Sequence, residues 1–133
     1  MHLVNRCTGE KHARSYKSTA FFVFHHANAY EQDGCIVIDF CSYENGDVVN
    51  RLSLENVRND MIVNESEEKR PYLTRLVFPL HVPDDAEPGE NFLANYTFAG
   101  KCTAVLETDS TICLREERLA DIGKASEMKT RPV

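Results

Sequence analysis

Apolar and β-branched residues gather along the chain into short runs that are separated by turn-forming residues. Residues 20–30 form a run rich in Phe and Val, and residues 35–43 form a second run of strand composition. Asp33 and Gly34 stand between the two runs. Because glycine accepts the positive φ that a two-residue hairpin turn requires, we expect these residues to form a β-hairpin.

Further turn signals extend this pattern. Asn45-Gly46 repeats the signal of the first turn and predicts a β-meander over residues 20–52. Two more runs predict strands, a short one at residues 2–7 and one at residues 72–82. In the second of these runs Pro79 lacks a backbone donor, which pushes part of the run to a sheet edge or a bend.

The segments between the strand candidates are less regular. Residues 52–59 fit a short helix or an extended arm, because their apolar positions suit both periods. Residues 60–70 and 83–91 are polar or proline-rich and predict loops. Residues 121–133 have no apolar period and predict a frayed tail.

A second hairpin is expected nearer the carboxyl end. Residues 101–107 and 111–115 have strand composition, and Thr108-Asp109-Ser110 would connect them as a three-residue loop. Short strands separated by turns indicate an all-β fold built from antiparallel β-meanders. These signals alone do not distinguish a sandwich, a barrel and a propeller.

Composition limits the class of protein. A chain of 133 residues with 42% hydrophobic residues fits one packed domain spanning residues 1–133. The net charge of −6 and the absence of a basic, aromatic surface argue against binding to nucleic acid. The first residues lack the apolar core of a secretory signal, so we expect a cytoplasmic protein. Five cysteines without C-x-x-C spacing predict free thiols rather than a disulfide framework or a zinc cage.

Two adjacent histidines, His25 and His26, lie within the first long strand candidate. Successive side chains of a regular strand point to opposite faces, so at most one of the two can face a given metal site. The other histidines, His2, His12 and His81, stand in unrelated segments. Composition alone therefore favours a hydrogen-bonded structural role for His25 over a metal-binding role.

Catalytic chemistry is not indicated by residue spacing. Glu31, Asp33 and Asp39 are close in sequence, but Asp33 has a turn role and Glu31 ends a strand candidate. Cys35 would need a base to act as a nucleophile, and none is suggested. No catalytic or organic-cofactor-binding residue is predicted.

One segment resembles a known family. FHHANAYEQDGCIVIDFCSYENG, residues 24–46, is similar to a signature segment of the carotenoid cleavage oxygenases, in particular the animal β-carotene oxygenases. Four further segments resemble the family in the expected order: HLVNRCTGE at 2–10, LSLENVR at 52–58, RPYLTRLVFPLHV at 70–82 and TAVLETDSTICL at 103–114. The resemblance covers nearly the whole chain.

The resemblance implies a seven-bladed β-propeller whose axis carries a ferrous iron, Fe(2+), held by four histidines. The first histidine of the F-H-H segment corresponds to one ligand, which is His25 here, and His26 would be its outward-facing neighbour. The implied reaction is the oxidative cleavage of a carotenoid, or another apolar polyene, by dioxygen to apocarotenal or retinal products. The complete enzyme could also make peripheral contact with a membrane.

Family members are several times longer, and this chain resembles the region of only one iron ligand. A lone imidazole does not retain iron, because each ligand contributes only part of the affinity. We therefore expect a fragment of the propeller domain that is inactive alone. The alternative is a non-catalytic β-rich binding or structural module derived from the family.

Overall fold

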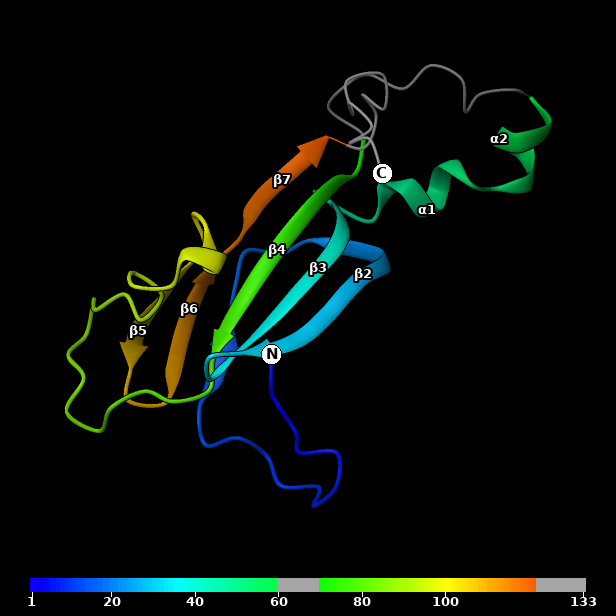
Figure 1. The fold of residues 1–133 in the computed structure, drawn as a ribbon. Helices are drawn as coiled ribbons and strands as arrows, with labels where there is room; N and C mark the ends of the chain where they lie inside the picture. Colours follow the sequence, from blue (N-terminus) through cyan, green and yellow to red (C-terminus); the bar gives the residue numbers. More distant parts are fainter. Residues whose placement is uncertain (60–69, 122–133) are drawn as a thin grey trace, which may run out of the picture.

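Two β-sheets form the body of the molecule (Figure 1). The structure is a computed structural model that describes residues 1–59 and 70–121. Its strands are β1 Ser15–Lys17, β2 Phe22–Gln32, β3 Cys35–Tyr43, β4 Tyr72–Pro79, β5 Thr103–Thr108, β6 Thr111–Arg115 and β7 Glu117–Asp121. Its helical segments are α1 Asp47–Arg51, α2 Leu54–Arg58 and the 3-10 turn η2 Thr97–Ala99. The expected all-β class is confirmed, with short helices added.

The larger sheet contains the hairpin expected from the sequence. Its strand order is β2-β3-β4-β7, and all its pairs are antiparallel. Asp33 and Gly34 both have positive φ, 49° and 75°, and connect β2 to β3 as a two-residue turn. β4 covers residues 72–79 of the strand expected at 72–82, and a bend follows at Leu80, directly after Pro79. The hairpin is thus confirmed, and the strand at 72–82 is confirmed over its first eight residues.

The smaller sheet has the order β1-β6-β5. β5 and β6 form the expected hairpin, but Thr108 pairs with Thr111, so its turn contains two residues rather than three. β1 pairs with β6 in parallel, and the expectation of antiparallel strands throughout was wrong for this strand. β1 can form with only three residues because the Ser15 N–H donates to the Ser110 carbonyl and anchors the strand beside the hairpin.

The hydrophobic core draws on both sheets. Tyr16 of β1 is 1% exposed and meets Phe78 of β4 edge to face, with ring centroids 5.3 Å apart. Its hydroxyl donates to the Pro79 carbonyl at 2.6 Å. Ile112 of β6 is fully buried in the same core. The short strand β1 therefore links the two sheets through one buried aromatic side chain.

Two strand expectations were wrong. Residues 2–7 form no strand, because the Asn5 side chain accepts the N–H groups of Cys7 and Thr8 and turns the chain. Asn45-Gly46 does not close another hairpin, since Gly46 has a φ of −82° and leads into α1. The β-meander over residues 20–52 therefore stops at the end of β3.

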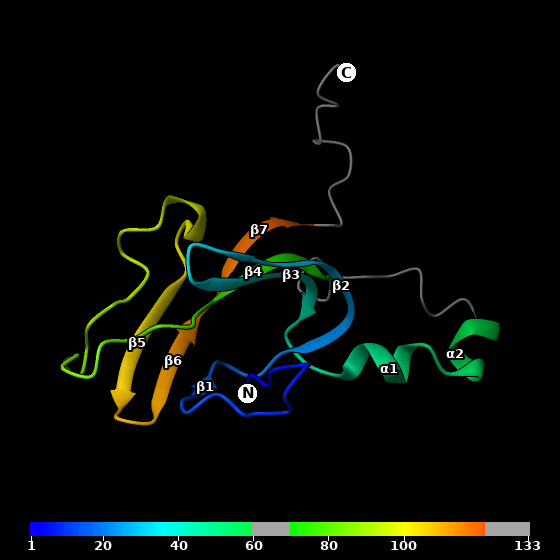
Figure 2. The ribbon, with the colours of Figure 1, turned by 60° about the horizontal axis from the view of Figure 1, so that its bottom comes forward.

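The two short helices project away from the sheets (Figure 2). For residues 52–59, the helical alternative is confirmed by α2, where the Ser53 side chain accepts the Asn56 N–H. Val48 is buried, whereas Leu54 is 73% exposed. Most of the expected loop at 60–70 and of the expected tail at 121–133 lies outside the described residues.

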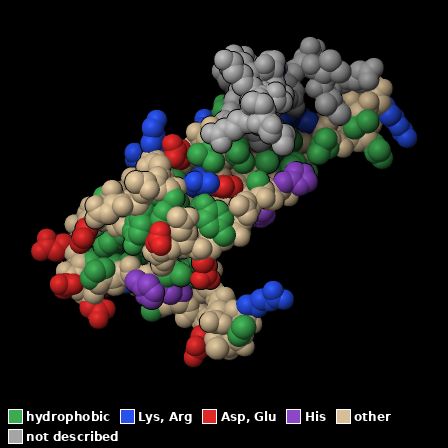
Figure 3. All heavy atoms as spheres, viewed as in Figure 1, with side chains coloured by type: hydrophobic (Ala, Val, Ile, Leu, Met, Phe, Trp, Pro, Cys, Tyr) green, Lys and Arg blue, Asp and Glu red, His purple; other side chains and the backbone are tan. Residues whose placement is uncertain are grey.

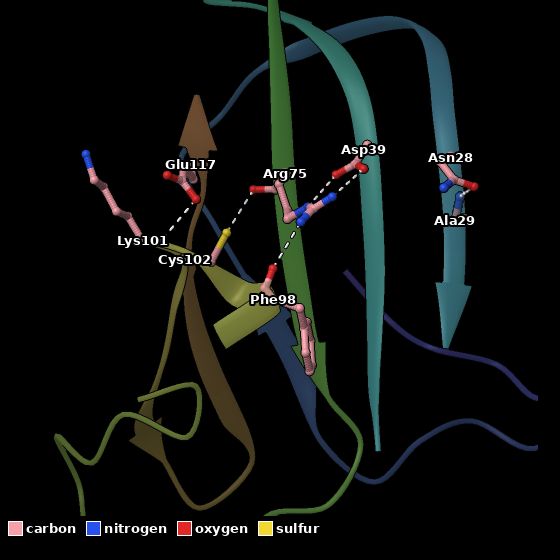
Figure 4. Close-up of polar contacts among 8 residues, drawn as sticks. All are labelled: Asn28, Ala29, Asp39, Arg75, Phe98, Lys101, Cys102 and Glu117. Atoms are coloured by element: carbon pink, nitrogen blue, oxygen red, sulfur yellow. Dashed lines mark hydrogen bonds and ion pairs between the residues drawn. The ribbon is translucent and has the colours of Figure 1, made fainter. Parts of the chain in front are cut away.

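A bidentate ion pair connects β3, β4 and η2 (Figure 4). Arg75 donates from Nε to Asp39 Oδ1 at 2.7 Å and from Nη2 to Asp39 Oδ2 at 2.8 Å. Its Nη1 donates to the Phe98 carbonyl at 3.0 Å. Hydrogen bonding to Asp39 raises the pKa of the Arg75 guanidinium. Both side chains are largely buried, 21% and 12% exposed, so the loss of either leaves a charge with little access to water.

We expect Asp39→Ala to lower the free energy of unfolding by about 3 kcal/mol, because Arg75 is then left unpaired. The matched control is Glu44→Ala, which breaks the exposed pair between Glu44 and Arg118. That change should cost less than about 1 kcal/mol. Urea unfolding of both variants measures the difference, and equal losses would contradict the buried role of Asp39.

A second constraint lies at Gly100, directly after η2. Gly100 has a φ of 59°, and a Cβ at this position would overlap the carboxylate of Glu117. That carboxylate accepts the Lys101 N–H at 2.9 Å (Figure 4). Position 100 therefore favours glycine for its backbone conformation, with a φ of 59° and a ψ of −120°, and a Cβ would also displace the Glu117 carboxylate from the Lys101 N–H.

We expect Gly100→Ala to destabilise the fold by more than Gly9→Ala does. Gly9 also has a positive φ, of 76°, but a Cβ at this position would have no atom within 4 Å, so its alanine variant reports backbone strain alone, about 1 kcal/mol. Thermal unfolding of the two variants measures the additional cost at Gly100, which combines its backbone conformation, with a ψ of −120°, and the displacement of the Glu117 carboxylate. A smaller loss at Gly100 than at Gly9 would refute this combined constraint.

Candidate functional site

His25 and His26 both lie on β2, which forms one edge of the larger sheet in the part of the chain that the structure describes. His25 pairs with Cys41 of β3, and His26 pairs with Phe40. Directly paired residues of antiparallel strands share a face, so the two histidines lie on opposite faces of the sheet. Both side chains are exposed.

The two faces differ in their neighbours. We call the face that carries Cys41 and Asp39 the Asp39 face, and the face that carries Phe40 the Phe40 face. His26 lies on the Phe40 face, where its ring is 6.2 Å from that of the buried Phe40. His25 lies on the Asp39 face, which also carries the ion pair with Arg75.

A cluster of aromatic rings lies next to His25 and reaches it through Phe24. The Phe24 ring lies 6.2 Å from the His25 ring and 4.8 Å from the Phe22 ring. Tyr43 completes the group, with its ring 5.9 Å from that of Phe24. We call Phe22, Phe24 and Tyr43 the aromatic cluster. It gives one side of His25 an apolar surface that residue spacing did not indicate.

The imidazole of His25 has no hydrogen-bond partner within residues 1–59 and 70–121, so both its ring nitrogens are open to a ligand. The ring of His12 is occupied instead, because Nδ1 lies 3.3 Å from the Arg14 nitrogen and Nε2 lies 3.0 Å from the Leu80 carbonyl. His12 therefore has the structural role that composition had favoured for His25.

A metal centre needs several ligands, and the described residues contain no group of three or more His, Cys, Asp or Glu side chains that could hold one. Figure 3 shows histidine side chains at separate places on the visible face. A neutral imidazole suits ferrous iron, so His25 fits such an ion as one ligand among several. The remaining ligands would have to come from other parts of a longer protein.

Two of the acidic residues considered for catalysis have structural roles, and the cysteine is buried. Asp33 forms the hairpin turn, and Asp39 is held in the ion pair with Arg75. Cys35 is 1% exposed, and burial raises the pKa of its thiol, which disfavours the nucleophilic thiolate. Arg75 was not singled out from the sequence, because its partner Asp39 lies 36 residues away. All five cysteines are free thiols, as expected.

No helix among the described residues is long and apolar enough to cross a bilayer.

Comparison with known proteins connects this chain to a family. The model of the retinal pigment epithelial membrane protein family matches residues 1–127. Human β,β-carotene 15,15′-dioxygenase is 34% identical over 119 residues, which cover 90% of this chain and 21% of the relative. The mitochondrial carotenoid-cleaving dioxygenase of Macaca fascicularis is 36% identical over 124 residues, which cover 89% of this chain and 21% of the relative.

A third relative covers less of the chain. The carotenoid isomerooxygenase of Drosophila melanogaster is 43% identical over 58 residues, or 44% of this chain. The chain spans about a fifth of the length of the first two relatives. Since the family model matches almost every residue and the relatives carry names of carotenoid-cleaving enzymes, the chain belongs to the carotenoid cleavage oxygenase family.

Proposed function

We propose that this chain is one segment of an iron(II)-dependent dioxygenase that cleaves a carotenoid double bond. The observation that supports the proposal most is the family membership, because relatives that match about nine-tenths of the chain are named as carotenoid-cleaving dioxygenases. The larger sheet, with four strands in the order β2-β3-β4-β7, has the strand number of one propeller blade. We propose that this sheet belongs to a seven-bladed propeller.

In this proposal His25 is one of four histidine ligands to the iron. Its exposed ring, without a hydrogen-bond partner among the described residues, supports that role. When bound, ferrous iron would supply the activation of dioxygen for oxidative cleavage to aldehyde or ketone products. The aromatic cluster of Phe22, Phe24 and Tyr43 would offer an apolar polyene an apolar surface beside His25.

The chain alone would hold no iron under this proposal, because it contributes a single ligand. A second candidate function is therefore a non-catalytic β-rich binding or structural module. The absence of a group of three or more potential ligands among residues 1–59 and 70–121 favours this candidate for the isolated chain. The two candidates differ in whether the missing ligands are encoded beside this segment.

In the full-length protein that carries this segment, His25→Ala should abolish iron retention and polyene cleavage, because one of four ligands is lost. His26→Ala is the matched control. It removes a ring that contacts Phe40, so it should lower stability while iron content is kept. Iron is measured by atomic emission on folded protein, and stability by thermal unfolding. Equal loss of iron in the two variants would refute the assignment of His25.

The isolated chain of 133 residues should purify without stoichiometric iron and should not cleave a carotenoid, since it lacks three of the four ligands. Metal analysis and a cleavage assay measure both properties. Tightly bound iron together with cleavage would rule out the non-catalytic module. A gene that encodes neither further blades nor further histidines beside this segment would instead overturn the enzyme proposal.

A further inference from the structure

β2 is interrupted on each side of the two histidines. Its pairing with β3 shifts register between Val23 and His25, and again between His26 and Asn28. Phe24 and Ala27 are the extra residues at these two shifts. Each shift is a β-bulge, a local irregularity that can redirect the side chains next to it. The pair His25-His26 is thus a short paired segment between two bulges.

The bulges decide which histidine lies on the Asp39 face. Val23 pairs with Ser42, and continuing that register without a bulge would place His25 opposite Phe40. On the other side Asn28 pairs with Asp39, and continuing that register back would place His26 opposite Cys41. A regular strand in either register would therefore put His26, not His25, on the Asp39 face. The two bulges therefore exchange the faces on which His25 and His26 would lie in a regular strand.

Ring contacts hold the pair in this reversed position. The extra residue Phe24 is 42% exposed, yet its ring meets Phe22 and Tyr43 nearly perpendicularly, at 87° and 86° between ring planes. Edge-to-face contacts of this kind stabilise aromatic pairs. On the opposite face, the ring of His26 lies against Phe40. The ring contacts of Phe24 therefore hold the first bulge in place. Ring contacts on both faces of the sheet hold the orientation of His25 and His26.

We propose that Phe24 is a positioning residue, whose ring contacts fix the bulge that turns His25, rather than His26, to the Asp39 face. The inference rests on the proposed function only because it takes the Asp39 face as the face that meets the metal. The bulges, the ring contacts and the face on which each histidine lies do not depend on that function. Phe24 acts through His25 in this role, because its contacts set the backbone position from which the imidazole projects.

Cross-strand disulfide formation tests the orientation directly. Directly paired residues of an antiparallel sheet have Cα atoms close enough for a disulfide, and Cys41 is a partly exposed free thiol opposite His25. The experiment places a second cysteine by His25→Cys or by His26→Cys in the full chain with Cys7→Ser, which removes an exposed thiol. Mild oxidation and mass spectrometry of linked peptides then give the rate of linkage to Cys41.

His25→Cys should link to Cys41 at least about tenfold faster than His26→Cys does, because only position 25 shares the face of Cys41. Adding Phe24→Ala should reduce this preference by about tenfold, the scale of the lost ring contacts. Phe24→Tyr keeps the ring and should keep the preference. Faster linkage from position 26, or a preference unchanged by Phe24→Ala, would overturn the proposal.

A second measurement needs no cysteine substitution. In the unmodified chain, proton NMR should show contacts between the rings of His26 and Phe40, and between the rings of His25 and Phe24. Contacts of His25 with Phe40 would overturn the proposal even if the cysteine variants fail to fold. Neither measurement involves iron, so a failure of the metal assignment in His25→Ala and a failure of this orientation are separate results.

Discussion

The bidentate ion pair between Asp39 and Arg75 is the interaction on which the larger sheet depends. It joins β3 to β4, and the third donor of Arg75 reaches the Phe98 carbonyl, so η2 is held against the same sheet. A largely buried guanidinium is tolerated only when its donors are satisfied, and Asp39 and Phe98 satisfy three of them. The ion pair therefore holds β3 in place against β4, and β2 takes its register from β3.

β2 itself is held from one side only within the described residues, and most of its side chains are exposed. A strand with one neighbour can take up extra residues, because a bulge disturbs only one ladder of hydrogen bonds. The same freedom leaves the orientation of His25 and His26 to local ring contacts. His25, the proposed metal ligand, therefore lies on β2, a long strand with one neighbour among the described residues. It stands beside β3, which the ion pair with Arg75 holds in place.

The sequence predicted local features well and features that depend on distant residues poorly. The hairpin at Asp33-Gly34 follows from glycine's tolerance of positive φ, whereas Asn45-Gly46 carries the same signal and begins a helix. The strand β1 was missed because three residues carry no period, and its partner β6 lies far along the chain. In the site, alternation predicted that the two histidines face apart. The bulge at Phe24 has no glycine to mark it, so the sequence did not show which face of the sheet carries each histidine, and the choice of His25 as the ligand came from the family resemblance.

We propose that His25, and not His26, meets the iron in the complete protein. Anomalous diffraction at the iron absorption edge, from crystals of the full-length protein that carries this segment, tests it most directly. The expected result is one iron peak within coordination distance of a ring nitrogen of His25, on the face of the sheet that carries Asp39. A peak beside His26, or one remote from both histidines, would contradict it.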